Sequence, residues 1–152
     1  MAADLIFLHR EKILLDTSIY ITRYRFGKYE GLFQALIQKS IFFLHSIVFE
    51  ELLVGANSNK EMEALQSMKK SFIKAKKLVT PSDKDWEETG MLLNKIIRRK
   101  ELNTKTAVTL THDVLLALSA RRMGIRVVTE NRKDFERIYS HRNFKLTIWS
   151  PQ

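Results

Sequence analysis

The chain contains no cysteine, which excludes disulfide bonds, thiolate catalysis and cysteine-based zinc sites. Two prolines and five glycines among 152 residues leave little room for long disordered linkers. Long apolar runs are also missing, because the apolar stretch at the N-terminus is only four residues long and is broken by His9 and Arg10. We therefore expect neither a signal peptide nor a membrane span, and we expect a cytoplasmic protein.

Positively charged residues are in excess. Lysine and arginine outnumber aspartate and glutamate by 26 to 17, so the net charge is +9. A basic protein of this size often binds a polyanion, most commonly nucleic acid, although a basic surface without any partner is the simpler alternative. The hydrophobic share of 45% is that of a globular protein, and the length predicts one domain covering residues 1–152.

Short apolar runs alternate with longer amphipathic segments along the chain. The runs predict buried strands at 12–15, 41–44, 78–80, 125–129 and 146–149. The amphipathic segments predict helices at 19–24, 32–38, 46–54, 61–76, 82–100, 112–123 and 134–138. This alternation predicts an α/β fold with a largely parallel central sheet.

Oxygen-bearing side chains follow several of these strands. Asp16 directly ends the first, and Asn131 and Asp134 follow the strand that ends at Thr129. Glu50 and Asp113 lie in the early turns of two helices. Each has an ordinary structural explanation as a helix cap, a turn residue or part of a solvated face. Their joint position at the carboxyl ends of strands, where open α/β sheets bind ligands, favours a functional site.

Carboxylates that lie close together repel one another, and a divalent cation relieves that repulsion. Magnesium and manganese prefer oxygen ligands, and such ions activate water and neutralise phosphate oxygens. The hydroxyls of Thr17, Ser18 and Thr129 are expected to support a carboxylate or a water molecule there.

Three stretches resemble the motifs of a known family: ILLDTSIYI, SIVFEELLVG and THDVLLALSARRMGIRVVTENRKDF. In order and spacing they are similar to those of PIN-domain proteins, specifically VapC-like toxins of toxin–antitoxin systems, over about residues 12–149. The resemblance implies a PIN-like α/β/α sandwich.

The motifs also imply roles for individual residues. Asp16 matches the first acidic ligand, with Ser18 as its supporting hydroxyl, and Asp113 matches the third acidic residue. Glu50 is preferred over Glu51 for the second, because it lies four positions after Ser46 as in the usual Ser-x-x-x-Glu-Leu spacing. The fourth metal ligand is either Asn131 or Asp134. Asp134 is counted with the catalytic acids.

The resemblance further implies a Mg²⁺- or Mn²⁺-dependent endoribonuclease that cleaves structured RNA. It implies inhibition by a small antitoxin whose C-terminal segment lies in the active-site groove, and usually a homodimer. Basic side chains are then expected to contact the RNA backbone. The candidates are Arg23, Arg25, Lys28, Arg132 and Lys133, with a further basic run at Arg98, Arg99 and Lys100.

Three other functions compete with this one. A haloacid-dehalogenase-type phosphatase also begins with an aspartate at a strand end, but it requires a second aspartate where this chain has Ser18. A catalytically silent PIN-like module would bind RNA without cutting it. A PIN protein could also act mainly as the antitoxin's partner in a DNA-bound complex.

Overall fold

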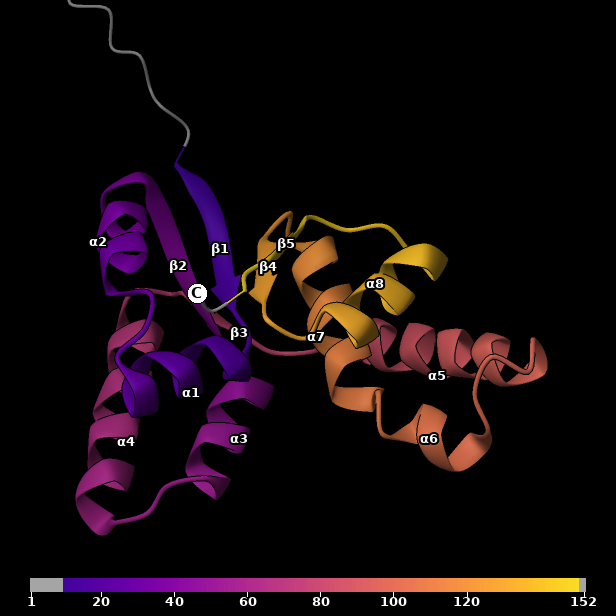
Figure 1. The fold of residues 1–152 in the computed structure, drawn as a ribbon, viewed down its shortest axis with the longest axis horizontal. Coiled ribbons are helices and arrows are strands. Elements are labelled where there is room, and N and C mark those ends of the chain that lie inside the picture. Colours follow the sequence, from indigo (N-terminus) through magenta and orange to yellow (C-terminus); the bar gives the residue numbers. More distant parts are fainter. Residues whose placement is uncertain (1–9, 151–152) are drawn as a thin grey trace, which may run out of the picture.

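A five-stranded sheet forms the centre of the molecule, in a computed structural model that describes residues 10–150 (Figure 1). The N-terminal stretch considered above as a signal or span lies outside these residues. The strands are β1 (Glu11–Leu15), β2 (Ser40–His45), β3 (Leu78–Val79), β4 (Arg126–Thr129) and β5 (Leu146–Ile148). Their order in the sheet is β3-β2-β1-β4-β5, and every neighbouring pair is parallel.

The strand order reverses direction at the centre of the sheet. From β1 the chain proceeds outward through β2 and β3, and it then returns to place β4 on the other side of β1. In open α/β sheets a crevice forms at such a reversal, outside the carboxyl ends of the two strands. Asp16 and Glu130, the residues that directly follow β1 and β4, therefore lie at the edge of the sheet where such a crevice is expected.

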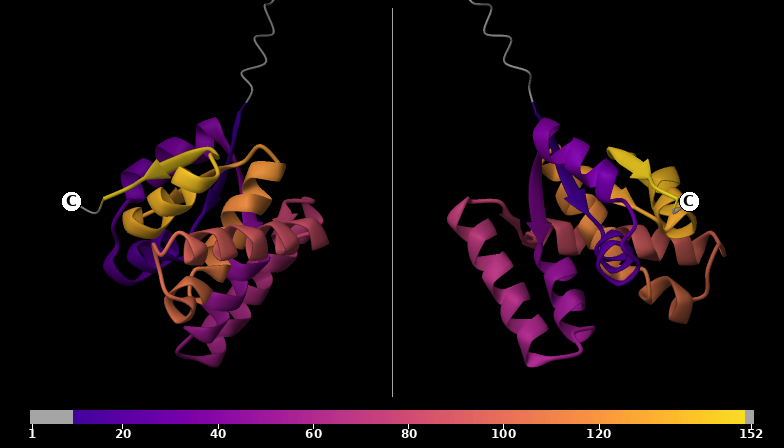
Figure 2. Two further views of the ribbon diagram at one scale, coloured as in Figure 1. Left: turned by 90° about the vertical axis from the view of Figure 1, so that its right-hand side faces the viewer. Right: turned by 60° about the vertical axis from the view of Figure 1, so that its left-hand side comes forward.

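Eight helices surround the sheet in the described residues. They are α1 (Thr17–Phe26), α2 (Glu30–Lys39), α3 (Ser46–Val54), α4 (Asn59–Lys74), α5 (Asp83–Arg98), α6 (Thr104–Val108), α7 (Thr111–Arg122) and α8 (Arg132–His141). Helices α3 and α4 lie side by side and extend past the sheet (Figures 1 and 2). Helices α5 to α8 gather at the other end of the molecule, where α5 packs on α7.

The core lies where β1 and β4 meet the helices. Leu14 is fully buried in the centre of the sheet. Ala117 and Ala120 of α7 are also fully buried, and their small side chains allow the helix to approach β4 closely. Burial on both faces explains why the parallel strands read as continuous apolar runs in the sequence.

Side-chain caps explain where several helices begin. Ser58 caps α4, and Ser82 with Asp85 forms a capping box at the start of α5. His45 caps α3 by accepting a hydrogen bond from the amide of Ile47, and Asn131 caps α8.

The sequence-based α/β prediction is confirmed, and the sheet is parallel throughout rather than largely so. Helix α6 was not predicted, because five residues are too few to show helical periodicity. Among residues 10–150, no helix is both long and apolar enough to cross a membrane.

Candidate acidic site at the sheet edge

Asp16 is held at the junction of β1 and β4. Its backbone amide donates to the carbonyl of Val128 at 2.9 Å, which continues the parallel pairing of the two strands. Its carboxylate oxygen Oδ2 accepts hydrogen bonds from the Thr129 hydroxyl at 2.7 Å and from the Ser18 hydroxyl at 2.9 Å. Asp16 is only 7% exposed. Its carboxylate is fixed in orientation by hydrogen bonds from two of the side chains predicted to support it.

The structure places the two adjacent glutamates in different surroundings. Glu50 points to solvent, whereas Glu51 accepts a hydrogen bond from the Thr17 hydroxyl and lies 3.1 Å from Nδ1 of His112. Consecutive helix residues point about 100° apart, so only one of them can face the neighbouring strand ends. The Ser46 spacing indicated Glu50, but the packing of α3 against α1 turns Glu51 toward the acidic site.

Asn131 connects the last two acidic residues. Its amide nitrogen donates to Asp113 at 3.3 Å and to Asp134 at 3.0 Å, while its oxygen accepts the Asp134 backbone amide and caps α8. Because the cap occupies the oxygen, the nitrogen faces the two carboxylates. Asp113 and Asp134 therefore lie together, and Asn131 holds them there.

Negative charge accumulates at this edge of the sheet. The pKa of Asp113 is raised to about 7, mainly by burial and additionally by the nearby carboxylates of Asp16, Asp134 and Glu51. Burial also raises the pKa of Asp16, although the hydroxyls of Thr129 and Ser18 oppose the shift. We define the acidic cluster as Asp16, Glu51, Asp113 and Asp134.

The acidic cluster offers carboxylate oxygens, which are ligands that suit a hard divalent cation. The charged groups that raise the pKa of Asp113 are all carboxylates as well. In the part of the chain that the structure describes, no three histidine, aspartate or glutamate side chains converge as a ready-made metal site. The Asn131 amide instead occupies the space between Asp113 and Asp134. Binding an ion there would require those two carboxylates to turn from the amide to the ion.

The basic residues predicted to bind RNA differ in their availability. Arg23 pairs with Glu30 at 3.2 Å and lies over the ring of Phe33, so it has a structural role. Arg132 pairs with Glu136 along α8. Arg25 is exposed, with one guanidinium nitrogen 3.4 Å from the carbonyl of Gly55 at the end of α3.

The remaining basic candidates are also at the surface. Lys28 and Lys133 are exposed, and the run Arg98, Arg99 and Lys100 is exposed at the end of α5.

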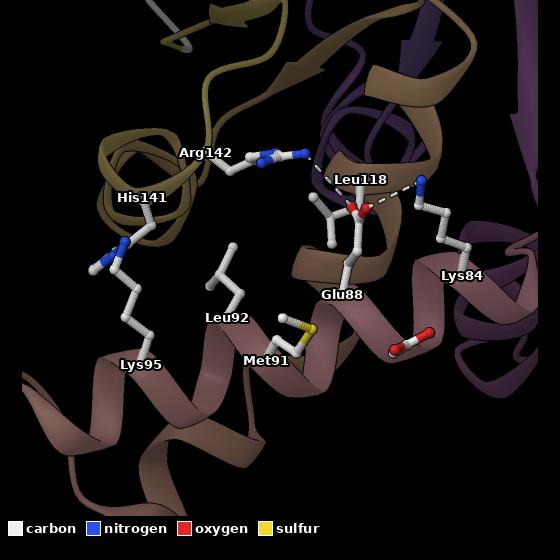
Figure 3. Close-up of a pocket in the computed structure, with 9 residues that line it drawn as sticks. Lys84, Glu88, Met91, Leu92, Lys95, Leu118, His141 and Arg142 are labelled. Carbon is white, nitrogen blue, oxygen red and sulfur yellow. Dashed lines mark ion pairs between the residues drawn. The ribbon is translucent and has the colours of Figure 1, made fainter.

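A separate hollow of about 380 Å³ lies among α5, α7 and α8 (Figure 3). No member of the acidic cluster lines it. Three of its charged groups pair with one another, since Glu88 lies 3.9 Å from both Lys84 and Arg142. The hollow is thus a partly apolar surface feature apart from the acidic cluster.

The spacing from Ser46 favours Glu50 and therefore misses Glu51 as a member of the site. The motifs also do not single out His112, whose signal in the sequence is its place directly before Asp113 in Thr-His-Asp. The three hydroxyls expected to support the site, those of Thr17, Ser18 and Thr129, all make hydrogen bonds within it.

The sheet order, the flanking helices and the strand-end carboxylates define a PIN-like α/β/α fold. Solved structures of VapBC and FitAB toxin–antitoxin complexes contain chains with this fold. A chain of VapBC2 from Rickettsia felis, solved bound to a DNA fragment from their promoter, is 25% identical, with a TM-score of 0.64. That match covers 91% of this chain and 98% of the other.

Two further structures show the same fold at lower identity. DNA-bound VapBC from Salmonella typhimurium is 22% identical over 92% of this chain and 99% of the other, with a TM-score of 0.65. FitAcB from Neisseria gonorrhoeae is 16% identical over 88% and 95%, with a TM-score of 0.61. No protein-family model matches the sequence, and no curated protein matches it. The VapC-like resemblance of the motifs is thus confirmed by the structural likeness.

Proposed function

We propose that this protein is a metal-dependent endoribonuclease and the toxin of a toxin–antitoxin pair. The observation that carries the proposal is the acidic cluster in a chain of net charge +9. A basic protein that gathers four carboxylates at the ligand-binding edge of its sheet combines attraction for a polyanion with ligands for a divalent cation. The likeness to VapBC and FitAB chains supports the toxin assignment.

The side chains divide into ligands and supports. Asp16, Asp113 and Asp134 would hold Mg²⁺ or Mn²⁺, which when bound would neutralise charge at the scissile phosphate and promote ionisation of water. Asp134 is favoured over Asn131 as the fourth ligand, because the Asn131 oxygen already caps α8.

Glu51 would orient the attacking water and accept its proton. Its carboxylate is held between the Thr17 hydroxyl and His112, and its side chain is one-third exposed. Ser18 and Thr129 fix the orientation of the Asp16 carboxylate through their hydrogen bonds. Exposed basic side chains such as Arg25 and Lys133 would contact the RNA backbone.

Metal binding can be tested without any assay of activity. We expect MgCl₂ or MnCl₂ to raise the melting temperature of the wild type, because a ligand that binds only the native state stabilises it. Asp113→Asn should reduce that rise and Glu50→Gln should preserve it. An equal rise in wild type and Asp113→Asn would place the ion elsewhere.

Cleavage is tested with structured RNAs in Mg²⁺ or Mn²⁺. Wild type should cut, and Asp16→Asn and Asp113→Asn should lose activity while remaining folded. Equal cleavage by all three proteins would reveal a contaminating nuclease and refute the proposal. RNA binding without cleavage by the wild type would indicate the catalytically silent RNA-binding module.

A role in a DNA-bound complex is a second candidate, because VapBC from two organisms and FitAB were solved with DNA. In both functions the protein would bind a small antitoxin. We also propose that it forms a homodimer. Expression of the wild type alone should arrest growth, while Asp16→Asn should not. Growth arrest by both forms would contradict the nuclease toxin.

A further inference from the structure

Helix α1 connects the acidic cluster to an exposed aromatic residue. The helix begins directly after Asp16, and Tyr24 lies in its last turn with 62% of its surface exposed. Tyr24 follows Thr17 by seven residues, which places both on the same face of the helix about 10 Å apart. Thr17 binds Glu51, so the exposed ring and the acidic cluster share one side of α1.

The ring of Tyr24 contacts two side chains of its own helix. It stacks on Tyr20 with ring centroids 6.3 Å apart and an interplanar angle of 14°. Tyr20 is 4% exposed and anchored in the core, and the Arg23 guanidinium lies 5.6 Å from the Tyr24 ring centroid. An aromatic ring that is exposed yet already ordered loses little conformational entropy when a partner stacks on it.

Positive charge flanks this ring. Arg23 and Arg25 are its neighbours in sequence, and Arg25 is exposed with a guanidinium nitrogen 3.4 Å from the carbonyl of Gly55. Exposed aromatic rings set among cationic side chains are the usual platform for unpaired nucleic-acid bases, whose stacking is tolerant of sequence.

We propose that Tyr24 stacks on an unpaired base of the RNA substrate while Arg25 contacts the adjoining phosphate. This assignment rests on the proposed ribonuclease function and specifies its substrate as RNA with single-stranded nucleotides beside the cleavage site. Phe26 is also exposed, at 68%, but lies nine residues after Thr17 and hence on the opposite face of α1.

The test measures binding to a short single-stranded RNA that carries 2-aminopurine, in EDTA so that no cleavage occurs. Tyr24→Ala should weaken binding about 5- to 150-fold, the range expected from stacking of roughly 1–3 kcal/mol per base. It should also abolish the quenching of 2-aminopurine fluorescence. Tyr24→Phe should behave as wild type, because it keeps the ring.

Trp86→Ala is the matched control, since Trp86 is a 53% exposed aromatic residue on α5. It should leave RNA binding unchanged. Melting curves of each variant establish that it is folded. If Tyr24→Ala left RNA binding and fluorescence quenching unchanged, the proposed stacking would be overturned. It would also be overturned if Tyr24→Ala weakened binding to a blunt RNA duplex, which has no unpaired bases, as much as binding to the single-stranded RNA. If Tyr24→Ala spared RNA but weakened binding of an antitoxin, the surface would belong to the protein partner.

The two proposals can fail separately. RNA binding that depends on Tyr24, without cleavage in Mg²⁺ or Mn²⁺, would overturn the nuclease and retain the platform. Cleavage with the same kcat/KM in wild type and Tyr24→Ala would retain the nuclease and overturn the platform.

Discussion

The hydroxyl of Thr17 donates a hydrogen bond to the carboxylate of Glu51, 34 positions later in the chain. This contact joins the first turn of α1 to the middle of α3. It directs Glu51 to the edge of the sheet where Asp16 and Asp113 lie. Glu51 is close enough to Asp113 that its carboxylate, like that of Asp16, raises the pKa of Asp113.

Glu51→Gln is expected to lower the rate of RNA cleavage about 100-fold or more, the usual contribution of a general base. Glu50→Gln removes the same charge one position earlier, on a side chain exposed to solvent, and should change the rate less than about twofold. Single-turnover cleavage of one RNA by the two variants makes the comparison. A larger loss of cleavage rate in Glu50→Gln would assign the catalytic role to Glu50, as the motif spacing predicts.

Asn131→Asp should make the protein depend more strongly on a divalent cation. The substitution replaces two hydrogen bonds, to Asp113 and Asp134, with repulsion between carboxylates. Without metal we expect a loss of roughly 1.5–3 kcal/mol in the free energy of unfolding, as for hydrogen bonds to charged groups. With saturating Mn²⁺ the melting temperature should recover. A loss of stability that Mn²⁺ does not reduce would show that the ion is not bound by these carboxylates.

His45 should make the stability of the fold depend on pH. Burial lowers its pKa to about 4, and its Nδ1 accepts the amide of Ile47 at the start of α3, which requires an unprotonated nitrogen. Because the native state favours the neutral ring, this stabilisation is complete above pH 6.5 and is lost as the pH falls toward 4.

The change at His45 amounts to roughly 2–3 kcal/mol between pH 7 and pH 4. His45→Asn retains a capping oxygen but does not titrate, so its free energy of unfolding should decline less over that interval. Urea unfolding at several pH values measures both slopes. Parallel slopes would mean that His45 does not control this dependence.

The pair Arg122–Asp85 is expected to stabilise the packing of α5 on α7. Asp85 is 2% exposed, and a nitrogen of Arg122 lies 2.9 Å from its carboxylate. Burial opposes ionisation of Asp85, but hydrogen bonds from Arg122 and Ser82 outweigh it and lower the pKa.

Arg122→Met should cost roughly 2–4 kcal/mol, because it leaves a buried carboxylate without its counter-ion. Asp85→Asn should cost less, since Arg122 is 40% exposed and can be solvated. The stabilisation from this pair is fully present at pH values above the ordinary carboxyl pKa. It is lost as the pH falls through the lowered pKa of Asp85. Denaturant unfolding at pH 7 ranks the two variants, and the opposite order would contradict this account.

Much of this protein follows from local sequence. The apolar run before Asp16 predicts a buried strand, and the caps at Ser82 and Asn131 mark helix starts, because both depend on neighbours close in the chain. The placement of Asp16, Asp113 and Asp134 at one sheet edge also followed from the alternation of strands and helices.

Tertiary structure decided the rest, because the remaining choices depend on how a helix is rotated against elements far away in sequence. Within the segment SIVFEELLVG the spacing from Ser46 favours Glu50, and only the rotation of α3 in the folded chain brings Glu51 to the hydroxyl of Thr17. Between positions 20 and 33, Tyr20 and Phe33 are core residues whereas Tyr24 and Phe26 are exposed. Pattern alone could not separate these aromatic residues, because their burial is set by contacts between α1, α2 and the sheet.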